Sequence, residues 1–532
     1  MQKHAIVPTT RSLSDVQGVL FYIISPHLDP EQSSSEEDIF LFRQTLLRSA
    51  LTCRNFTRPA LTALWRWLPS DKPLISLLCT LGIAQDRVLL ERGPPITTSY
   101  GLSALKDPRM HPNWTRFLEY AMRVRKICLN PSTDPLGVKW SIWTEVTQFI
   151  PDEPILPRLQ SVDITSNDMF APCTAPLLLV APSVREMTVW LRGSNDDRIY
   201  DPKPNYVLSE ACARAPHLQT IALSIIPWVL DPSFLHYNPH LRSVSIHSLL
   251  KMENLAPLTH LTELEYLSII PHSIDIGNGV APLYFPSLRA LLVRSDWRFI
   301  EDLLDGLQAP HIHSLSLHVS RIDPRQAIEQ PRRCLQTIAT TFSTLEKLCV
   351  ECAETPRHPS HYRIPFSATA PLDTRAALMA IIEPLLSLSR LRHVSLSFPI
   401  FLLRLASDDV HRLSEAWPDI EDLRIDIATV DRGRAGLEST VHFAHRCPRL
   451  RALRLPAMDL AVDAFEGLEY PAEPHLLRDL NVTEVLFPRE ADLSREIMAT
   501  FIQRVFPNAV VPFAKRPSVV TDEESGDRSR LV

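Results

Sequence analysis

Few residues in this sequence have the types and spacing that catalysis or metal binding requires. Cys349 and Cys352 form a Cys-x-x-Cys pair, and His358 and His361 lie close together in a proline-rich segment. A zinc site needs a second pair of ligands at suitable spacing, and a redox pair needs a strand–helix–strand context. The sequence shows neither, so we interpret both pairs as structural.

Sequence motifs of common enzymes are also missing. We find no His-Glu-x-x-His, no Gly-x-Ser-x-Gly, no phosphate-binding loop and no Gly-x-Gly-x-x-Gly. Glycine, which lets a backbone approach a phosphate closely, occurs only 13 times in 532 residues. We therefore expect no enzyme activity, no metal and no cofactor. Titratable residues clustered in a deep pocket would revive an enzymatic interpretation.

Composition and charge restrict the partners and the compartment. The formal net charge is −6 and the isoelectric point is near 6.3, which gives no electrostatic basis for binding nucleic acid or an anionic membrane. The nine cysteines are scattered and suggest no disulfide framework. No apolar run reaches the ~18–20 residues of a membrane helix, and the N-terminus lacks the apolar core of a signal peptide. We expect a cytoplasmic or nuclear protein.

A short repeated phrase determines the elements that would position functional side chains. Aliphatic residues recur at positions 1, 4 and 6 of the phrase, as in Leu450, Leu453 and Leu455. Several copies begin 23 to 30 residues apart, within or close to the ~20–29 period of leucine-rich repeats. The thirteen copies begin at Val124, Leu159, Val184, Leu218, Leu241, Leu264, Leu288, Ile312, Leu345, Leu391, Ile420, Leu450 and Leu477.

Each phrase predicts one strand of a parallel sheet. Side chains alternate along a strand, so positions 4 and 6 share one side while positions 3, 5 and 7 share the other. Eight copies carry proline two residues before position 1, where we expect it to end the preceding helix. Helical patterns lie between copies, for example at residues 299–307 and 376–388. We predict an α/β fold, a horseshoe-shaped solenoid of about 13 leucine-rich repeats with the strands on its concave face.

Three helical segments are expected before the repeats. In residues 14–25 the apolar side chains share one helical face. A second helix is expected over residues 38–49, and Pro59 is expected to open a third. Three such short helices would form a small cluster with little core of its own.

These helices carry a resemblance to a known family. Residues 19–30, 51–56 and 60–68 resemble the first helix, the middle signature and the tryptophan-containing end of an F-box. The combination is similar to F-box proteins that are numerous in mushroom-forming fungi, in which irregular leucine-rich repeats follow the F-box. An F-box usually opens Leu-Pro-x-Glu, whereas here Ser14 follows Leu13 and the proline is missing.

The resemblance implies a substrate receptor of a cullin-based ubiquitin ligase. Its helices would bind a Skp-family adaptor, and through it a cullin, while the repeats hold a target protein. The alternative is a repeat scaffold for protein–protein interaction, in which the F-box has decayed and no link to ubiquitin remains. The adaptor contact, or the core beneath it, would come from Val19, Leu20, Ile23, Leu64 and Trp65.

The concave face is the expected site of target binding. Aromatic and arginine side chains commonly supply most of the binding energy of an interface. The candidate contacts at positions 3, 5 and 7 are Trp190, Tyr266, His318, Arg424 and Arg454. The expected domains are a flexible N-terminus (1–12), an F-box-like domain (13–70), a helical transition (71–123), the solenoid (124–513) and a disordered tail (514–532).

Overall fold

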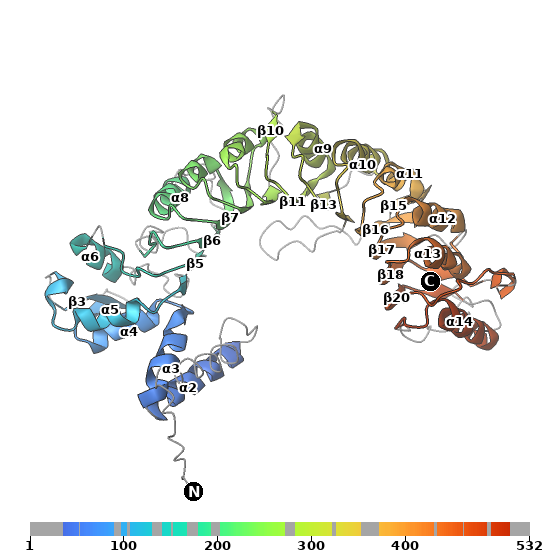
Figure 1. Ribbon diagram of the computed structural model, residues 1–532. Coiled ribbons are helices and arrows are strands. Elements are labelled where there is room, and N and C mark those ends of the chain that lie inside the picture. The colour runs from blue at the N-terminus through green and yellow to red at the C-terminus, as the bar shows by residue number, and fades with distance from the viewer. Residues whose placement is uncertain are drawn as a thin grey trace, which may run out of the picture. The chain divides into compact units, whose positions relative to one another are not determined.

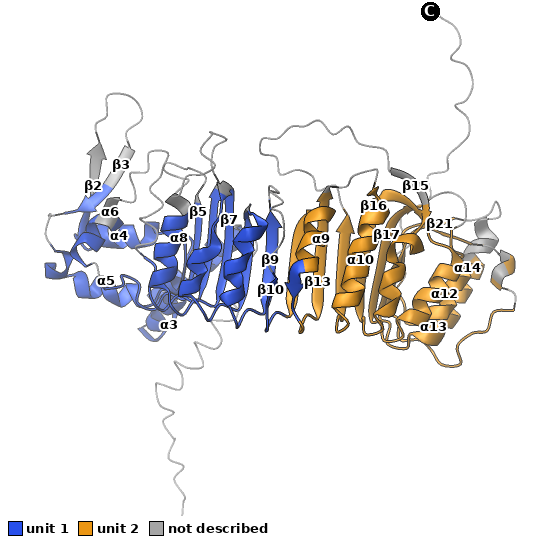
Figure 2. Cartoon of the chain, turned by 90° about the horizontal axis from the view of Figure 1, so that it is seen from above, with its two compact units in different colours: residues 1–288, 306–309 blue, residues 289–305, 310–532 orange. Residues whose placement is uncertain are grey.

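The chain of the computed structural model (Figure 1) divides into two compact units, which Figure 2 shows in different colours. One unit comprises residues 1–288 with 306–309, and the other residues 289–305 with 310–532. The structure describes residues 36–52, 54–89, 97–103, 107–129, 141–150, 153–166, 179–192, 203–271, 282–321, 326–352, 372–429, 434–460, 462–465, 467–486 and 491–510.

A helical hairpin opens the described part of the chain. Helices α2 (Glu36–Thr52) and α3 (Arg54–Arg66) pack around the buried side chains of Leu46, Ala50 and Ala60. The two predicted helices are therefore present, but the expectation that Pro59 opens the second is wrong. A single residue separates α2 from α3, so Pro59 lies inside α3. Residues 14–25, the first predicted helix, lie outside the described residues.

Arg43 of α2 anchors this hairpin to the sheet. Its Nη1 donates to the carbonyl oxygens of Leu64, at 3.3 Å, and Trp67, at 3.0 Å, where a cation is favoured at the end of α3. Burial lowers the pKa of the Arg43 guanidinium. Strand β1 (Trp67–Leu68) follows α3 directly and pairs in parallel with β4 (Lys126–Leu129). The hairpin is thus continuous with the first strand of the sheet.

The segment between β1 and the second repeat strand contains an antiparallel hairpin and short helices. The carboxylate of Glu145 accepts the backbone N–H of Leu102 at 2.8 Å, which ties this hairpin to the helix at residues 141–149. The elements are α4 (Lys72–Thr80), β2 (Ala84–Leu89), β3 (Thr97–Leu102), the 3₁₀ turn η2 (Pro108–Met110), α5 (Trp114–Ala121) and α6 (Ser141–Phe149).

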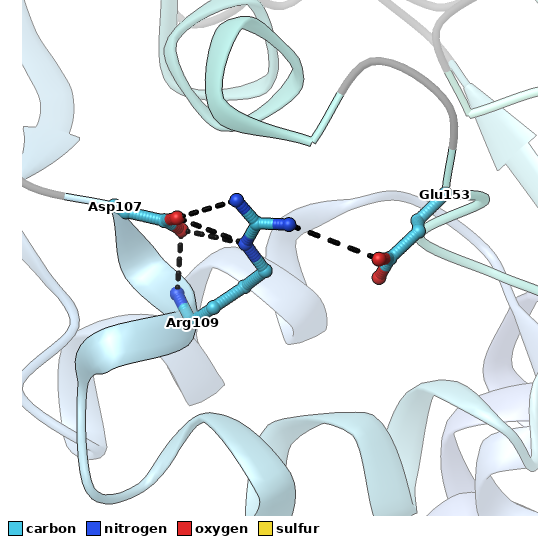
Figure 3. A network of polar contacts seen from close by, with 3 residues as sticks. All are labelled: Asp107, Arg109 and Glu153. Atoms are coloured by element: carbon cyan, nitrogen blue, oxygen red, sulfur yellow. Dashed lines mark hydrogen bonds and ion pairs between the residues drawn. The ribbon is translucent and has the colours of Figure 1, made fainter.

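A surface network holds η2 in place (Figure 3). The carboxylate of Asp107 accepts the backbone N–H of Arg109 at 3.0 Å and its guanidinium at 2.6 to 3.0 Å. Arg109 also lies 3.8 Å from Glu153, just before the next strand. The hydrogen bonds from Arg109 lower the pKa of Asp107. The network is exposed, so its role is local positioning rather than stability.

In the first unit, parallel strands follow one another in sequence order along the sheet. After β1 and β4 these are β5 (Ser161–Ser166), β6 (Glu186–Arg192), β7 (Thr220–Val229), β8 (Ser243–Leu249) and β9 (Tyr266–Pro271). The helical layer includes α8 (Lys203–Arg214), η5 (Pro232–Tyr237) and η6 (Met252–His260), and β10 (Leu283–Tyr284) pairs with β12 (Leu307–Gln308).

The second unit repeats this order. Its strands are β11 (Ala290–Asp296), β13 (Ser314–Arg321), β14 (Lys347–Cys352), β16 (His393–Arg404), β17 (Asp422–Thr429), β18 (Ala452–Leu455) and β20 (Asp479–Val482). Strand β15 (Leu372–Ala377) pairs with the far end of β16, and β19 (Met458–Asp459) pairs with β21 (Val485–Leu486). The helical layer contains α9 (Trp297–Gly306), α10 (Glu329–Thr341), α11 (Met379–Ile382), η8 (Glu383–Ser387), α12 (Ser407–Ala416), η9 (Leu437–Thr440), α13 (Val441–Arg446), η10 (Val462–Phe465) and α14 (Ala491–Val505).

All thirteen predicted phrases form strands of these two runs. Positions 1, 4 and 6 of every copy are buried, with Val482 of the last copy as the one exception. Position 2 joins neighbouring copies, because its carbonyl accepts the N–H groups of positions 2 and 3 of the next. Gln160, for example, accepts from Arg185 at 2.8 Å and Glu186 at 3.0 Å. This ladder satisfies the backbone at the start of each strand.

The proline of the phrase begins a tight turn. The N–H of position 1 donates three residues back, from Leu159 to Leu156 at 3.1 Å and from Leu450 to Cys447 at 3.1 Å. The proline follows the acceptor, where its fixed φ suits the second residue of a β-turn and no N–H is needed. The proline therefore starts the turn that leads into the strand. The sequence predicted only that it ends the preceding helix.

The helical layer follows the predictions in part. The helix expected over residues 299–307 is α9. The helix expected over residues 376–388 is split into α11 and η8, because Pro384 cannot donate the next α-helical hydrogen bond. None of the helices that the structure describes is long and apolar enough to cross a membrane. Thirteen parallel strands, with such turns and helical segments between them, define the chain as an α/β leucine-rich-repeat solenoid.

Candidate functional site

The open face of each sheet run, the side away from the helices, displays positions 3, 5 and 7 of every phrase. The parallel register places equal positions of neighbouring strands side by side. Each row therefore presents one side chain per repeat, at steps of ~4.8 Å. All five predicted target-binding residues lie on this surface, three in the second unit and two in the first.

Trp190 is an exposed indole on the open face of the first unit. It is 45% exposed and stands in one row with Ser224 and His247. The Ser224 hydroxyl and His247 Nδ1 are 3.2 Å apart. An exposed indole beside a polar pair can cover an apolar side chain of a partner and orient it with a hydrogen bond.

Tyr266, on the same face, is 37% exposed and stands at position 3 of β9, beside Ser243. It is three strands and four residues along the strand from Trp190, a separation of roughly 20 Å. The structure therefore does not bring the two aromatic residues together. The surface between them is small, neutral and hydroxyl-rich, and it is formed by Thr188, Thr220, Ala222, Ser224, Ser243, Ser245 and Ser268.

Arg424 and Arg454 are brought together in the second unit, as register partners on β17 and β18. Arg424 is held by Asp422 of its own strand, with Nη2 2.9 Å from Oδ2 and Nε 3.1 Å from Oδ1. This hydrogen bonding raises the pKa of Arg424. Arg454 is exposed on the neighbouring strand. Arg424 offers a guanidinium whose orientation is fixed by Asp422, and Arg454 offers one that extends into solvent. Both can donate hydrogen bonds to a carboxylate of a partner.

His318 lies three strands from this arginine pair. Its Nδ1 is 2.7 Å from Oε2 of Glu351 on the adjacent strand, and its side chain is 20% exposed. The carboxylate orients the imidazole and leaves Nε2 for a partner. This half-buried pair is better suited to hydrogen bonding than to a large contact area. The open face is therefore charged around His318 and the arginine pair, whereas the surface between Trp190 and Tyr266 in the first unit is neutral.

The thiols of the described chain are placed for packing rather than chemistry. Cys349 is half-buried on the open face, whereas Cys352 is fully buried on the opposite side of the same strand. The two sulfurs of the Cys-x-x-Cys pair therefore point apart. Burial raises the pKa of both, and it raises the pKa of Cys128 to about 11. No group of three or more metal-ligating side chains occurs within the described ranges.

Leu64 and Trp65, two predicted adaptor contacts, face inward. Leu64 packs against the core of the α2–α3 hairpin. The ring of Trp65 lies 5.0 Å from that of Tyr120 on α5. Val19, Leu20 and Ile23 lie outside the described residues. The two described residues thus support the helices from beneath, which is one of the two roles expected for this set.

Sequence reasoning missed the exposed apolar side chains of α2. Phe40 is 66% exposed, Leu47 47% and Leu51 79%, and their spacing places them in one line along the helix. The hairpin also carries the exposed arginines Arg48, Arg54 and Arg58, and α3 contains no acidic residue. The sequence did contain a signal for these exposed residues, because α2 carries apolar side chains on two of its faces.

No protein-family model and no curated protein matches the chain. An internalin, InlF of Listeria monocytogenes, is similar with a TM-score of 0.32 at 12% identity, over 84% of this chain and 96% of that one. A leucine-rich-repeat protein of Leptospira interrogans has a TM-score of 0.32 at 12% identity, over 75% and 98% of the two chains. The assignment to the leucine-rich-repeat class rests on the strands, turns and ladder themselves.

Proposed function

We propose that this chain is a substrate receptor of a cullin-based ubiquitin ligase. Its N-terminal helices bind a Skp-family adaptor, and the open face of its repeats binds a target protein. The observation that supports this most directly is the joining of two surfaces in one chain: a helical hairpin with exposed apolar side chains runs directly into a leucine-rich-repeat sheet. In this role the protein works in the cytoplasm or the nucleus.

The adaptor site is formed by the helices between residues 14 and 66. Val19, Leu20 and Ile23 supply apolar contacts or the core beneath them, and Leu64 and Trp65 hold the hairpin on the repeats. The exposed arginines of the hairpin favour an adaptor surface rimmed by carboxylates. The chain performs no chemistry in this role, because it acts by raising the local concentration of target lysines near a conjugating enzyme.

The target site is the open face. The first unit offers Trp190 and Tyr266 on a neutral, hydroxyl-rich surface. The second offers His318 and the pair Arg424 and Arg454. Apolar side chains of a target would complement the first surface, and carboxylates would complement the second.

A second candidate function is a repeat scaffold without a ubiquitin link. The missing proline of the Leu-Pro-x-Glu opening favours it. Adaptor binding distinguishes the two functions. The scaffold would retain the open face and its target but would not bind a Skp-family adaptor.

The test is binding of purified full-length chain to a purified Skp-family adaptor. The double variant Leu20→Asp with Ile23→Asp is expected to abolish binding while the repeats stay folded. Thr45→Asp, an exposed change on the side of α2 away from Phe40 and Leu47, is the matched control and should bind like wild type. Unchanged binding of the adaptor by the double variant would contradict the adaptor assignment. Absence of binding between the adaptor and the wild type would contradict it as well. Deleting residues 1–70 is less informative, because it also removes β1.

A further inference from the structure

The residues at position 2 of the phrase line the edge of the sheet at which the strands begin. The backbone ladder fixes their order, because the N–H of each position 2 donates to the carbonyl of position 2 on the preceding strand. Neighbouring members are therefore one strand step apart, about 4.8 Å. In the first unit this run, which we call the entry row, comprises Arg66, Arg125, Gln160, Arg185, Gln219 and Arg242.

Four arginines of this edge have no carboxylate to balance them. Arg66, Arg125 and Arg185 of the entry row form no ion pair within the described part of the chain, and neither does Arg158. The guanidinium of Arg125 is held in place, since its Nη1 donates to the carbonyl oxygens of Met122, at 3.0 Å, and Arg158, at 3.3 Å. Burial and the positive charges of Arg158 and Arg66 lower the pKa of Arg125. These charges therefore lie close enough to repel one another.

Arginines at the equivalent positions of the second unit are balanced. Arg392, at position 2 of its phrase, lies 3.8 Å from Glu421. Arg449, directly before position 1 as Arg158 is, lies 3.4 Å from Asp419. The repeat fold itself thus does not require unbalanced arginines at these positions. A run of one sign of charge raises the local concentration of anionic partners, at the cost of repulsion within the free chain.

We propose that the entry row and Arg158 bind an extended, acidic segment of a partner protein. The three strand steps from Arg66 to Arg185 span about 14 Å, and an extended peptide presents side chains on one side every ~6.8 Å. Three carboxylates on alternate residues therefore match this length. Each guanidinium can hold a carboxylate with two parallel hydrogen bonds. Gln160 and Gln219 carry both donors and acceptors, which suit the backbone of such a peptide.

Other anions fit this edge less well. A single phosphate is bound by donors that converge on one point, whereas these guanidiniums are spread along a line. Single-stranded nucleic acid is bound with aromatic side chains on which the bases stack, and the entry row contains none. The net charge of −6 also repels a nucleic-acid backbone. The entry row is separate from positions 3, 5 and 7, so the inference does not rest on the proposed function.

Fluorescence anisotropy of a labelled octaglutamate peptide, titrated with the full-length chain at about 20 mM salt, tests the proposal. Wild type should bind, and the binding should weaken as salt is raised to about 0.15 M. Arg158→Glu with Arg185→Glu should weaken binding at least about tenfold, because repulsion replaces two attractive contacts.

Arg392→Glu with Arg449→Glu is the matched control. It changes the net charge equally and at the same two positions of the phrase, but its arginines are already paired with carboxylates. Its affinity for octaglutamate should stay within about twofold of wild type. Arg158→Gln with Arg185→Gln removes the two charges without reversing them and should weaken binding at least about threefold. This neutral variant decides the question if the charge reversal disturbs folding.

Four results would overturn the proposal. The first is a wild type that does not bind octaglutamate at low salt, and the second is a neutral variant that binds it as tightly as wild type. The third is equal weakening in the Arg158 and Arg185 reversal and in the matched control, because binding would then depend on net charge alone. The fourth is tighter binding of an octathymidylate than of octaglutamate, which would identify nucleic acid as the ligand.

Discussion

His475 is held as a neutral imidazole by two backbone groups. Its Nε2 donates to the carbonyl of Cys447 at 2.9 Å, and its Nδ1 accepts the N–H of Leu477 at 3.1 Å. The residue is 5% exposed, and burial lowers its pKa although the bond to Cys447 opposes this. Protonation of Nδ1 would remove the second bond and place a charge in the core.

The protein should therefore lose stability in mild acid. The folded pKa of His475 lies below the ordinary value of 6.5, so the contribution of the neutral form is complete above about pH 6.5 and is lost as pH falls below it. Between pH 7.5 and 5.5 the loss from this one group is at most about 1.4 kcal/mol, because the unfolded histidine, with the ordinary pKa of 6.5, takes up no more than that in protonation free energy over this range. Urea unfolding of the full-length chain at pH 7.5 and 5.5 measures it.

Asn238 provides the control for this prediction. It lies one residue earlier in its repeat than His475 and likewise donates to the preceding repeat, to the carbonyl oxygens of Cys212, at 3.1 Å, and Ala215, at 2.6 Å. His475→Asn should keep a donor there and reduce the pH dependence. Some dependence should remain, because burial also lowers the pKa of His442. An equal change with pH in wild type and variant would contradict the role of His475.

The sequence did not predict this buried corner. Asn238 and Cys447 lie three residues before position 1 of their repeats and His475 lies two residues before it, and each forms a hydrogen bond to a carbonyl of the preceding repeat. Three side chains of different type, at positions that differ by one residue, perform one task, so no motif is visible. Only the hydrogen bonds of the folded chain reveal it.

The strands were predictable at the scale of elements because each has one buried and one open face. Leu453 is 1% exposed and its neighbour Arg454 is exposed. Leu453→Ala should destabilise the chain by about 2–5 kcal/mol. Arg454→Ala should change the free energy of unfolding by less than about 0.5 kcal/mol. Equal effects in urea unfolding would refute the assignment of faces.

The turn before each strand gives a second prediction at this scale. Phe342 (φ −115°, ψ 62°) has nearly the conformation of Cys447 (φ −118°, ψ 69°), which precedes a proline. Ser343 occupies the place of that proline. Ser343→Pro should raise the free energy of unfolding by about 0.4–1 kcal/mol, because it restricts the unfolded chain.

A proline at Lys347, the first residue of β14, is the control. Lys347 donates its N–H to the carbonyl of His313 at 2.9 Å, so Lys347→Pro removes a bond of the ladder. It should destabilise the chain, in contrast to Ser343→Pro. If both substitutions destabilise to the same extent in urea unfolding, the turn described here is wrong.

The helical layer and α2 show why other elements were harder to predict. Pro384 divides one expected helix, and the 3₁₀ turns η5 and η6 replace helices in two repeats of 23 residues. The exposure of Phe40 and Leu47 depends on which face of α2 meets α3. That choice is made by tertiary packing, which periodicity along one helix does not reveal.

At the scale of the whole molecule, the chain is a scaffold with two separate surfaces. The helices lie before the repeats, and the predicted target contacts lie on the open faces of the sheet runs. Phrase and period were sufficient to predict the solenoid. They do not select the partner, because the apolar positions that define a repeat are buried in every copy. Specificity therefore lies in residues that the repeat pattern leaves free.

The separation of the two surfaces is the central claim, and affinity purification with quantitative mass spectrometry tests it most directly. Wild type should retain a Skp-family adaptor, a cullin and a target. Leu20→Asp with Ile23→Asp should lose adaptor and cullin and keep the target. Trp190→Ala with Arg454→Glu should keep adaptor and cullin and lose at least about 90% of the target, the effect of roughly 1.4 kcal/mol. Loss of all partners together in either variant, or wild type without an adaptor, would contradict the account.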